Sequence, residues 1–336
     1  MIRSEESDHG AVSTAVQIAE PESQYRSGEH TLGLLSTPLN LSVLRTLSER
    51  PMRLAELRQA TGLPAQTTLR GHLGGLEEIG AVAKRPTQRM PYAVENELTP
   101  MGEELLDVAR ALEAWLQRAP KGPISLESNA AKGIVKAFVD GWGSTIVRSL
   151  ASRPMSLTEL DREIPDFSYP ALERRLSSMR MAGLIEARPG NGSGTPYALT
   201  DWARRGVRPL AAAVHCERVY MGRRAAPVTE LDIEGAFLLA TPLVGLPDRS
   251  SGVCQLEVEA APGLRSQSGV KVEVEGGRVV ACERGLGGDR TSYAIGTTTK
   301  WFTAIKEGSL NELRFGGGRQ FAEGFVRAMH VTLMKD

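Results

Sequence analysis

The side chains that most often carry out catalysis or bind metals are dispersed along this sequence of 336 residues. Cys216, Cys254 and Cys282 are odd in number and widely separated, which argues against a disulfide framework or a four-thiolate metal site and fits a reducing compartment. The glycine runs 285–288 and 316–318 lack the lysine and the strand-to-helix context of a phosphate loop. No serine lies in a nucleophile elbow. The histidines, which lack metal-ligand spacing, are His9, His30, His72, His215 and His330. We therefore expect no enzyme, no metal and no cofactor.

The charge distribution along the chain favours binding of a polyanion by the first part of the protein. The net charge is zero, and 41% hydrophobic and 24% charged residues are typical of a globular protein. Residues 45–89 carry eight Lys and Arg against four Asp and Glu, whereas residues 228–336 carry twelve against fourteen. The first part would therefore meet a polyanion. No stretch approaches the roughly 18 apolar residues of a membrane span, and the N-terminus lacks the apolar core of a signal peptide, so we expect a cytoplasmic protein without a membrane partner.

An internal repeat organises the residues that could make such contacts. Residues 45–57 return as residues 148–160, and the offset of 103 holds without a gap from residue 45 to residue 86. Thirteen of these 42 positions are identical, where chance predicts roughly two or three. A further echo, Pro-Tyr and then Leu-Thr, follows each copy after small changes in length. The chain therefore contains a duplicated unit of about a hundred residues.

Each copy predicts three helices and a two-stranded wing. Apolar residues at steps of three and four predict the helices, and Arg-Pro ends the first of them because proline disfavours a helical residue before it. Gly80 and Gly183 follow the third helix, where a left-handed terminator is needed, and short β-prone runs flank a basic loop. The positions that define the helices are Leu41, Leu44, Leu47, Leu54, Leu57, Leu69, Leu73, Leu76 and Ile79, with Ile146, Val147, Leu150, Leu157, Leu160, Leu172, Leu176, Met179 and Ala182 in the second copy.

Both copies resemble the HxlR-type winged helices of bacterial regulators. The resemblance rests on Pro-Met-x-Leu-x-Glu-Leu, on Leu-x-x-x-Leu before a Gly-hydrophobic-hydrophobic step, and on Pro-Tyr and Leu-Thr, and it covers residues 35–118 and 138–215. The cysteine of redox-sensing members has no counterpart, so thiol sensing is unsupported. Ser168 can cap the third helix of the second copy, where the first copy has Ala65. The resemblance implies a DNA-binding transcriptional regulator.

In a helix-turn-helix, the outward residues at the start of the third helix lie near base edges, and the wing meets phosphates or the minor groove. The alternative is that these residues are only the solvated face of an amphipathic helix. One chain could be a pseudo-dimer that reads two unlike half-sites or could form a homodimer, or one copy could have lost groove contact. The candidate DNA-binding residues are Gln66, Thr67, Arg70, Gly71, Lys84, Arg85 and Arg89 in the first copy and Ser168, Tyr169, Glu173, Arg174 and Arg188, with Asn191, in the second.

Beyond residue 225 the pattern changes to alternating strands. Residues 270–275 and 278–282 flank Gly276-Gly277 and predict a hairpin, followed by strands around 291–295 and 310–315 and two further helices. This part resembles sterol-carrier-protein-type lipid-binding domains, through the hairpin, Trp301 with Lys306-Glu307-Gly308, and Gly316 to Gly318. The resemblance implies an apolar cavity, although the same residues could be ordinary core. Its candidate lining residues are Phe237, Leu238, Leu243, Trp301, Phe302, Phe321, Phe325 and Met329.

The sequence therefore predicts a multidomain protein: two winged-helix domains, mainly α with a β wing, and an α+β sterol-carrier-like domain. The expected segments are a flexible tail (1–30), two winged helices (31–121 and 122–225) and a ligand-binding domain (226–336). The expected function is that of a repressor that binds operator DNA and responds to an apolar metabolite or antibiotic. The alternative is a protein that sequesters a toxic apolar compound and keeps the winged helices as scaffold. A DNA-repair enzyme would need a catalytic polar pair, which the sequence does not reveal.

Overall fold

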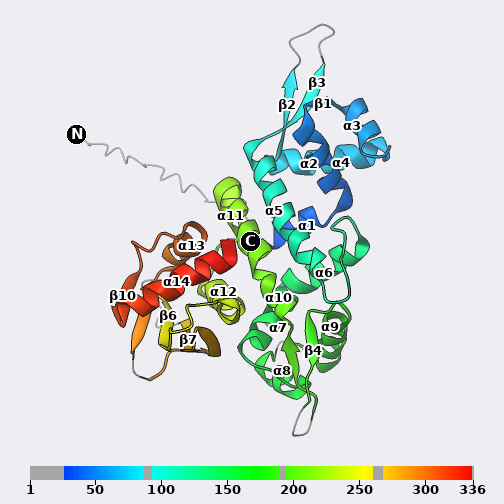
Figure 1. Ribbon diagram of the computed structural model, residues 1–336. Helices are drawn as coiled ribbons and strands as arrows, with labels where there is room; N and C mark the ends of the chain where they lie inside the picture. Colours follow the sequence, from blue (N-terminus) through cyan, green and yellow to red (C-terminus); the bar gives the residue numbers. More distant parts are fainter. Residues whose placement is uncertain are drawn as a thin grey trace, which may run out of the picture.

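The first unit of the chain is a helical bundle with a three-stranded sheet (Figure 1). The computed structural model describes residues 26–86, 93–165, 167–189, 194–259, 268–288 and 290–334, with Trp142 described by its main chain alone. Strands β2 and β3 form the antiparallel wing, and β1 pairs with the other edge of β3. The elements are α1 (Glu29–Leu35), α2 (Pro38–Glu49), β1 (Met52–Arg53), α3 (Leu54–Ala60), α4 (Gln66–Glu78), β2 (Val82–Pro86), β3 (Val94–Leu98) and α5 (Pro100–Gln117).

The second unit repeats this order of elements, except that β1 is reduced to an isolated bridge between Met155 and Tyr197 and that two helices follow the wing in place of α5. Helices α7, α8 and α9 have the same lengths as α2, α3 and α4 and begin 103 residues later, and β4 begins at the same offset from β2. The helices repeat at the same offset as the sequence because the repeated leucines occupy the buried face of each helix. The elements are α6 (Asn129–Val139), α7 (Gly141–Ser152), α8 (Leu157–Glu163), α9 (Tyr169–Met181), β4 (Ile185–Ala187), β5 (Tyr197–Leu199), α10 (Asp201–Arg205) and α11 (Val207–Cys216).

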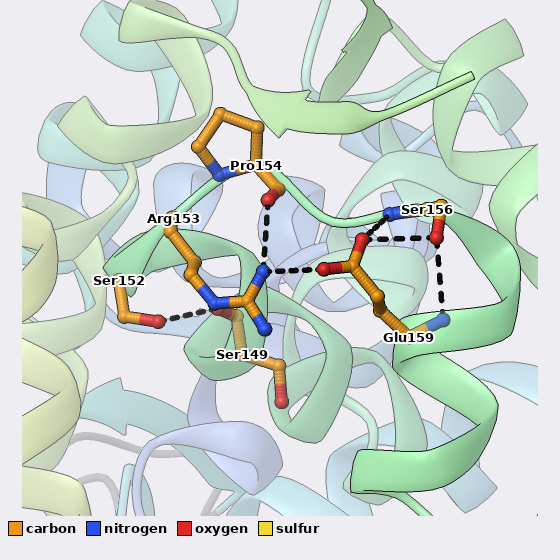
Figure 2. A network of polar contacts seen from close by, with 6 residues as sticks. All are labelled: Ser149, Ser152, Arg153, Pro154, Ser156 and Glu159. Carbon is orange, nitrogen blue, oxygen red and sulfur yellow. Dashed lines mark hydrogen bonds and ion pairs between the residues drawn. The ribbon is translucent and has the colours of Figure 1, made fainter. Parts of the chain in front are cut away.

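The Arg-Pro-Met-x-Leu-x-Glu motif builds the entrance to α8 (Figure 2). Ser156 is the N-cap, and its hydroxyl accepts a hydrogen bond from the Glu159 N–H, while the Glu159 carboxylate accepts one from the Ser156 N–H at 2.7 Å. Arg153 donates to both Glu159, at 2.8 Å, and the carbonyl of Pro154. In the first copy Arg53 replaces the serine and has no side-chain acceptor, so only the carboxylate half of this capping arrangement is retained.

Glu159→Gln is expected to destabilise the protein at neutral pH and to have a smaller effect in acid. The hydrogen bond from the Ser156 N–H and the one from Arg153 lower the pKa of Glu159 from 4.5 to about 2. Because the folded-state pKa is lowered, this stabilisation is complete above the ordinary value of 4.5 and is lost as the pH falls through the folded value of about 2. Urea unfolding of both proteins from neutral pH down to about pH 3 measures the difference, and a difference that stays constant with pH would contradict the assignment.

The C-terminal domain is a five-stranded sheet with helices packed against it. The strand order is β10-β9-β6-β7-β8; β6 and β9 are parallel and the other pairs antiparallel. Val270, Val272 and Val274 alternate along β7 and are buried on the face that α12 covers. The elements are η1 (Glu217–Met221) and η2 (Gly222–Arg224), which connect the second unit to this domain, then α12 (Glu230–Ala240), η3 (Thr241–Leu243), β6 (Gly252–Val258), β7 (Ser268–Glu275), β8 (Arg278–Arg284), β9 (Ser292–Gly296), α13 (Thr298–Glu307), β10 (Arg314–Gly317) and α14 (Arg319–Met334).

The last strand differs from the sequence-based expectation. A strand was expected at 310–315, but β10 is Arg314–Gly317, and Leu310 and Leu313 form a turn that buries both side chains. Glycine explains the register. Gly317, which pairs with Ser292 on β9, has a φ of 61°, and a Cβ there would lie about 2.1 Å from the Thr291 carbonyl oxygen, so this end of the pairing requires glycine.

The two units are stacked with their wings at opposite ends of the molecule (Figure 1). Helices α4 and α9 lie on one side of the stack, and the C-terminal domain lies on the other side, next to α11. No helix in the described part of the chain is long and apolar enough to cross a membrane.

Candidate nucleic-acid interface

Helix α4 presents an unoccupied face to solvent. Leu69, Leu73 and Leu76 are buried beneath it, and the spacing of these leucines directs the intervening residues outward. The four candidates of this helix, Gln66, Thr67, Arg70 and Gly71, are all exposed. Arg70 forms no ion pair with any described residue, so its guanidinium is available to an incoming partner.

The exposed face of α4 also carries two glycines that the sequence analysis did not single out. Gly74 and Gly75 follow Gly71, and a methyl group at any of the three would meet nothing within 4 Å. Packing within the protein therefore does not require them, although each glycine inside a helix costs about 1 kcal/mol relative to alanine. A helix without side chains on this face can lie with its backbone close to another surface. The signal in the sequence was three glycines within five residues.

Helix α9 offers a different set of groups in the equivalent position. Ser168, Tyr169, Glu173 and Arg174 are exposed, above the buried Leu172 and its neighbours. Position 70 of the first copy corresponds to Glu173, so an arginine in one helix is replaced by a carboxylate in the other. The two exposed faces therefore differ in charge as well as in shape.

Ser168 does not cap α9 through its side chain, contrary to the sequence-based expectation. It is the N-cap residue, but its hydroxyl accepts no hydrogen bond from the helix. Pro170 at the second helical position has no N–H, and the N–H of Ala171 is bonded to the carbonyl of Ser168 at 2.9 Å. The hydroxyl therefore remains at the solvent side of the helix start.

The cationic residues of the wings are exposed but paired. Lys84 contacts Glu77 at 2.8 Å, Arg85 contacts Glu97 at 3.4 Å, and Arg188 on the other wing contacts Glu186 at 3.3 Å. Exposed ion pairs are worth about 0–1 kcal/mol, so a phosphate could replace these carboxylates at little expense. Arg89 and Asn191 lie outside the described residues.

The two units contact each other through equivalent elements. Helix α1 packs against α6, which begins 100 residues after it, and α5 packs against α11, the second helix after the second wing. The indole of Trp115 on α5 stacks on that of Trp202 on α10, with ring centroids 4.7 Å apart. Each indole N–H donates to the backbone carbonyl of the other residue, at 2.7 and 2.8 Å.

Two cations, one from each side of the same interface, each donate a hydrogen bond to a helix end of the other unit. Lys121 donates to the carbonyl of Met181 at the end of α9, and Arg224 donates to the carbonyl of Glu78 at the end of α4. Glu78 and Met181 are equivalent residues of the repeat, 103 positions apart. Lys121 and Arg224 lie beyond the wings, where the offset is 101, and are therefore within two positions of equivalence. Each unit thus places a cation at the negative C-terminal end of the other unit's exposed helix. Reciprocal contacts of this kind are those of a two-fold dimer interface.

Most of the predicted ligand-binding residues lie in the core of the C-terminal domain. Phe237 and Trp301 pack edge to face with centroids 4.6 Å apart, and the Trp301 indole N–H donates to the carbonyl of Glu257. Phe302, in contrast, borders an apolar pocket that lies between this domain and the second unit. The fully buried candidates are Phe237, Leu238, Trp301, Phe325 and Met329, and the half-buried ones are Leu243, Phe302 and Phe321.

The three thiols are poorly suited to nucleophilic chemistry. Cys216 and Cys254 are buried and Cys282 is half-buried, and burial raises the pKa of each to about 12. Among the residues that the structure describes, no three His, Cys, Asp or Glu side chains are grouped so that they could hold a metal ion.

Helices α3 and α4, the turn between them and the β2–β3 wing define a winged helix-turn-helix domain. Residues 34–121 match the family described as HxlR-like helix-turn-helix, which confirms the sequence-based prediction for the first unit. That family consists of DNA-binding transcriptional regulators and is not enzymatic. No curated protein matches the chain.

Proposed function

We propose that the protein is a transcriptional repressor that binds operator DNA with two winged helices in one chain. The observation that carries this proposal is the exposed, unpaired face of α4 in the HxlR-like domain, with Gln66, Arg70 and Gly71 directed away from the core. Glutamine and arginine can each make bidentate contacts to base edges in the major groove. A glycine-lined face lets the helix backbone approach the duplex closely.

The second unit is proposed to be the other half of a pseudo-dimer. The offset of 103 residues and the reciprocal contacts of Lys121 and Arg224 support this arrangement. Because Arg70 of one helix corresponds to Glu173 of the other, the two helices would read unlike half-sites, and the operator would be asymmetric. The residues proposed for the second half-site are Ser168, Tyr169, Glu173, Arg174 and Arg188.

The C-terminal domain is proposed to be the sensor. It resembles sterol-carrier-type domains in its hairpin and in the helices that cover its sheet, and several side chains join it to the second unit, among them Glu163, which pairs with Arg284 at 3.3 Å. Arg204 donates to the carbonyl of Leu238, and Arg208 donates to that of Thr332. An effector that favoured one arrangement of domain and unit would change operator affinity, and DNA would change effector affinity by the same factor.

We expect the protein to bind a fragment of its own promoter more tightly than a random duplex of equal length, and with a steep salt dependence. For six or more phosphate contacts, affinity should fall by about 10³ between 50 and 200 mM salt. Fluorescence anisotropy with both duplexes at several salt concentrations measures this. Equal affinity for the two duplexes at every salt concentration would overturn the proposed function.

A further inference from the structure

An apolar pocket lies where the second unit meets the C-terminal domain. Helices α6, α7 and α11 form one wall, with Phe138, Val147 and Leu210, and α12 and α13 form the other, with Ile233 and Phe302. The pocket encloses about 120 Å³. An engineered protein cavity of about 150 Å³ binds benzene, so this volume suits a body the size of one aromatic ring.

Arg148 on α7 lines this pocket, and its side chain has an unsatisfied donor. Its Nε is buried and has no hydrogen-bond partner. A buried donor without a partner destabilises the folded protein, and more so when it is charged, so such groups usually have a function or a missing partner.

In the first copy, the equivalent arginine has ion-pair partners. Arg45 is the residue 103 positions earlier, and its guanidinium forms ion pairs with Glu113 and Glu127. At the offset of 101 residues that relates Thr99 to Thr200, Glu113 corresponds to Val214, which is another lining residue of the pocket. The second copy has therefore kept the arginine, and a valine stands where one of its carboxylate partners would be.

The other charges at the pocket do not replace that carboxylate. Arg26 and Lys306, which also line it, are cations. Asp232 is engaged in the capping box of α12, where it accepts from both the N–H and the hydroxyl of Thr229. Glu234 is buried beside the pocket and pairs with Arg284 at 2.9 Å.

The pKa of Arg148 is consistent with the absence of a carboxylate partner among these neighbouring charges. Burial has the largest effect and lowers the pKa of its guanidinium, and repulsion from Arg284 and Arg26 lowers it further. Attraction to Glu234 and Asp232 opposes this lowering but does not reverse it. An anion in the pocket would relieve both effects, and an arginine fork matches the two oxygens of a carboxylate.

We propose that the junction pocket binds a small carboxylate whose apolar body fills the cavity and whose carboxylate accepts hydrogen bonds from Arg148. The binding itself is independent of the proposed function; only its consequence for DNA rests on it. Because the walls come from both the second unit and the C-terminal domain, the ligand would stabilise one arrangement of the two, which makes this pocket the sensor site.

The test is calorimetric titration of the full chain, without DNA, with benzoate and octanoate and with the uncharged benzyl alcohol and octanol. We expect the acids to bind about tenfold to a hundredfold more tightly than the alcohols, as a charge-assisted contact predicts. Arg148→Gln should remove that preference and leave alcohol binding unchanged. Arg45→Gln, the matched change in the first copy, should leave both unchanged. Ala236→Phe, which fills the pocket from α12, should weaken acids and alcohols alike.

Two results would overturn the inference: acids and alcohols binding equally to the wild type, including not at all, or an Arg148→Gln protein that keeps its preference for acids. Thermal unfolding of each variant confirms that it is folded. Adding benzoate to the promoter-binding assay separates the two proposals. Binding of benzoate that leaves DNA affinity unchanged would contradict the sensor role alone, whereas specific DNA binding by a protein that binds no acid would contradict the pocket alone.

Discussion

Trp202→Ala is expected to lower the free energy of unfolding by about 3–5 kcal/mol, the range for truncating a buried aromatic residue. The side chain is 6% exposed, and it stacks on Trp115 across the interface between the two units. Its loss would leave a cavity beside Trp115 and would remove one of the two donors to the Trp115 carbonyl, the other being the Arg118 N–H. Urea unfolding monitored by fluorescence and circular dichroism measures the change.

Trp202→Phe separates packing from hydrogen bonding at the same position. Phenylalanine keeps a stacked ring but has no N–H. We expect a loss of about 0.5–1.5 kcal/mol, the net contribution of one hydrogen bond, because the Trp115 carbonyl keeps the Arg118 N–H as a donor at 3.1 Å. Promoter binding should weaken in the alanine variant even where it is folded, because the spacing of α4 and α9 depends on this contact. An alanine variant that loses less than about 1 kcal/mol would show that the stacked pair does not hold the units together.

The double substitution Gln66→Ala and Arg70→Ala is expected to lower affinity for the promoter fragment by at least about 30-fold, because each bidentate base contact is worth about 1–3 kcal/mol. Affinity for random duplex should fall much less. Both residues are exposed, so stability should change by no more than about 0.5 kcal/mol. The ratio of the two affinities, measured at one salt concentration, isolates sequence reading from phosphate contact.

Two variants serve as controls for this experiment. Arg110→Ala removes an exposed cation on α5 that pairs with Asp107, and it should not change promoter preference. Glu173→Ala removes a carboxylate from the exposed face of α9, and it should raise affinity for any duplex if that face meets phosphates. A double variant that still prefers the promoter as strongly as the wild type would exclude α4 as the reading helix.

Local sequence was sufficient for three helices of the first unit and for its wing, but not for α1 or α5. The three helices and the wing follow from Leu69, Leu73 and Leu76, from Arg-Pro and from Gly80, because periodic burial and chain termination depend on neighbours within a few residues. The repeat carried the same expectation to α7, α8 and α9. The outward positions of Gln66 and Arg70 followed from the same periodicity.

The ligand-lining residues could not be predicted in this way. Trp301 and Phe302 are adjacent in the sequence, yet Trp301 is buried against Phe237 while Phe302 borders the junction pocket. Hydropathy is the same for a residue that faces a packed core and for one that faces a cavity. The difference depends on which distant elements lie opposite, and that is a property of the packed chain.

The sequence by itself determined the duplicated unit, its elements and the face of α4 that is free to bind, because these depend on short-range periodicity. Only the tertiary structure decided that Lys121 contacts the C-terminal end of α9 and Arg224 that of α4. It also decided that Arg148 lacks the carboxylate partners that Arg45 has. In both cases the deciding partners are distant in the chain and meet only when the units pack together, so identical residues in the two copies acquire different surroundings.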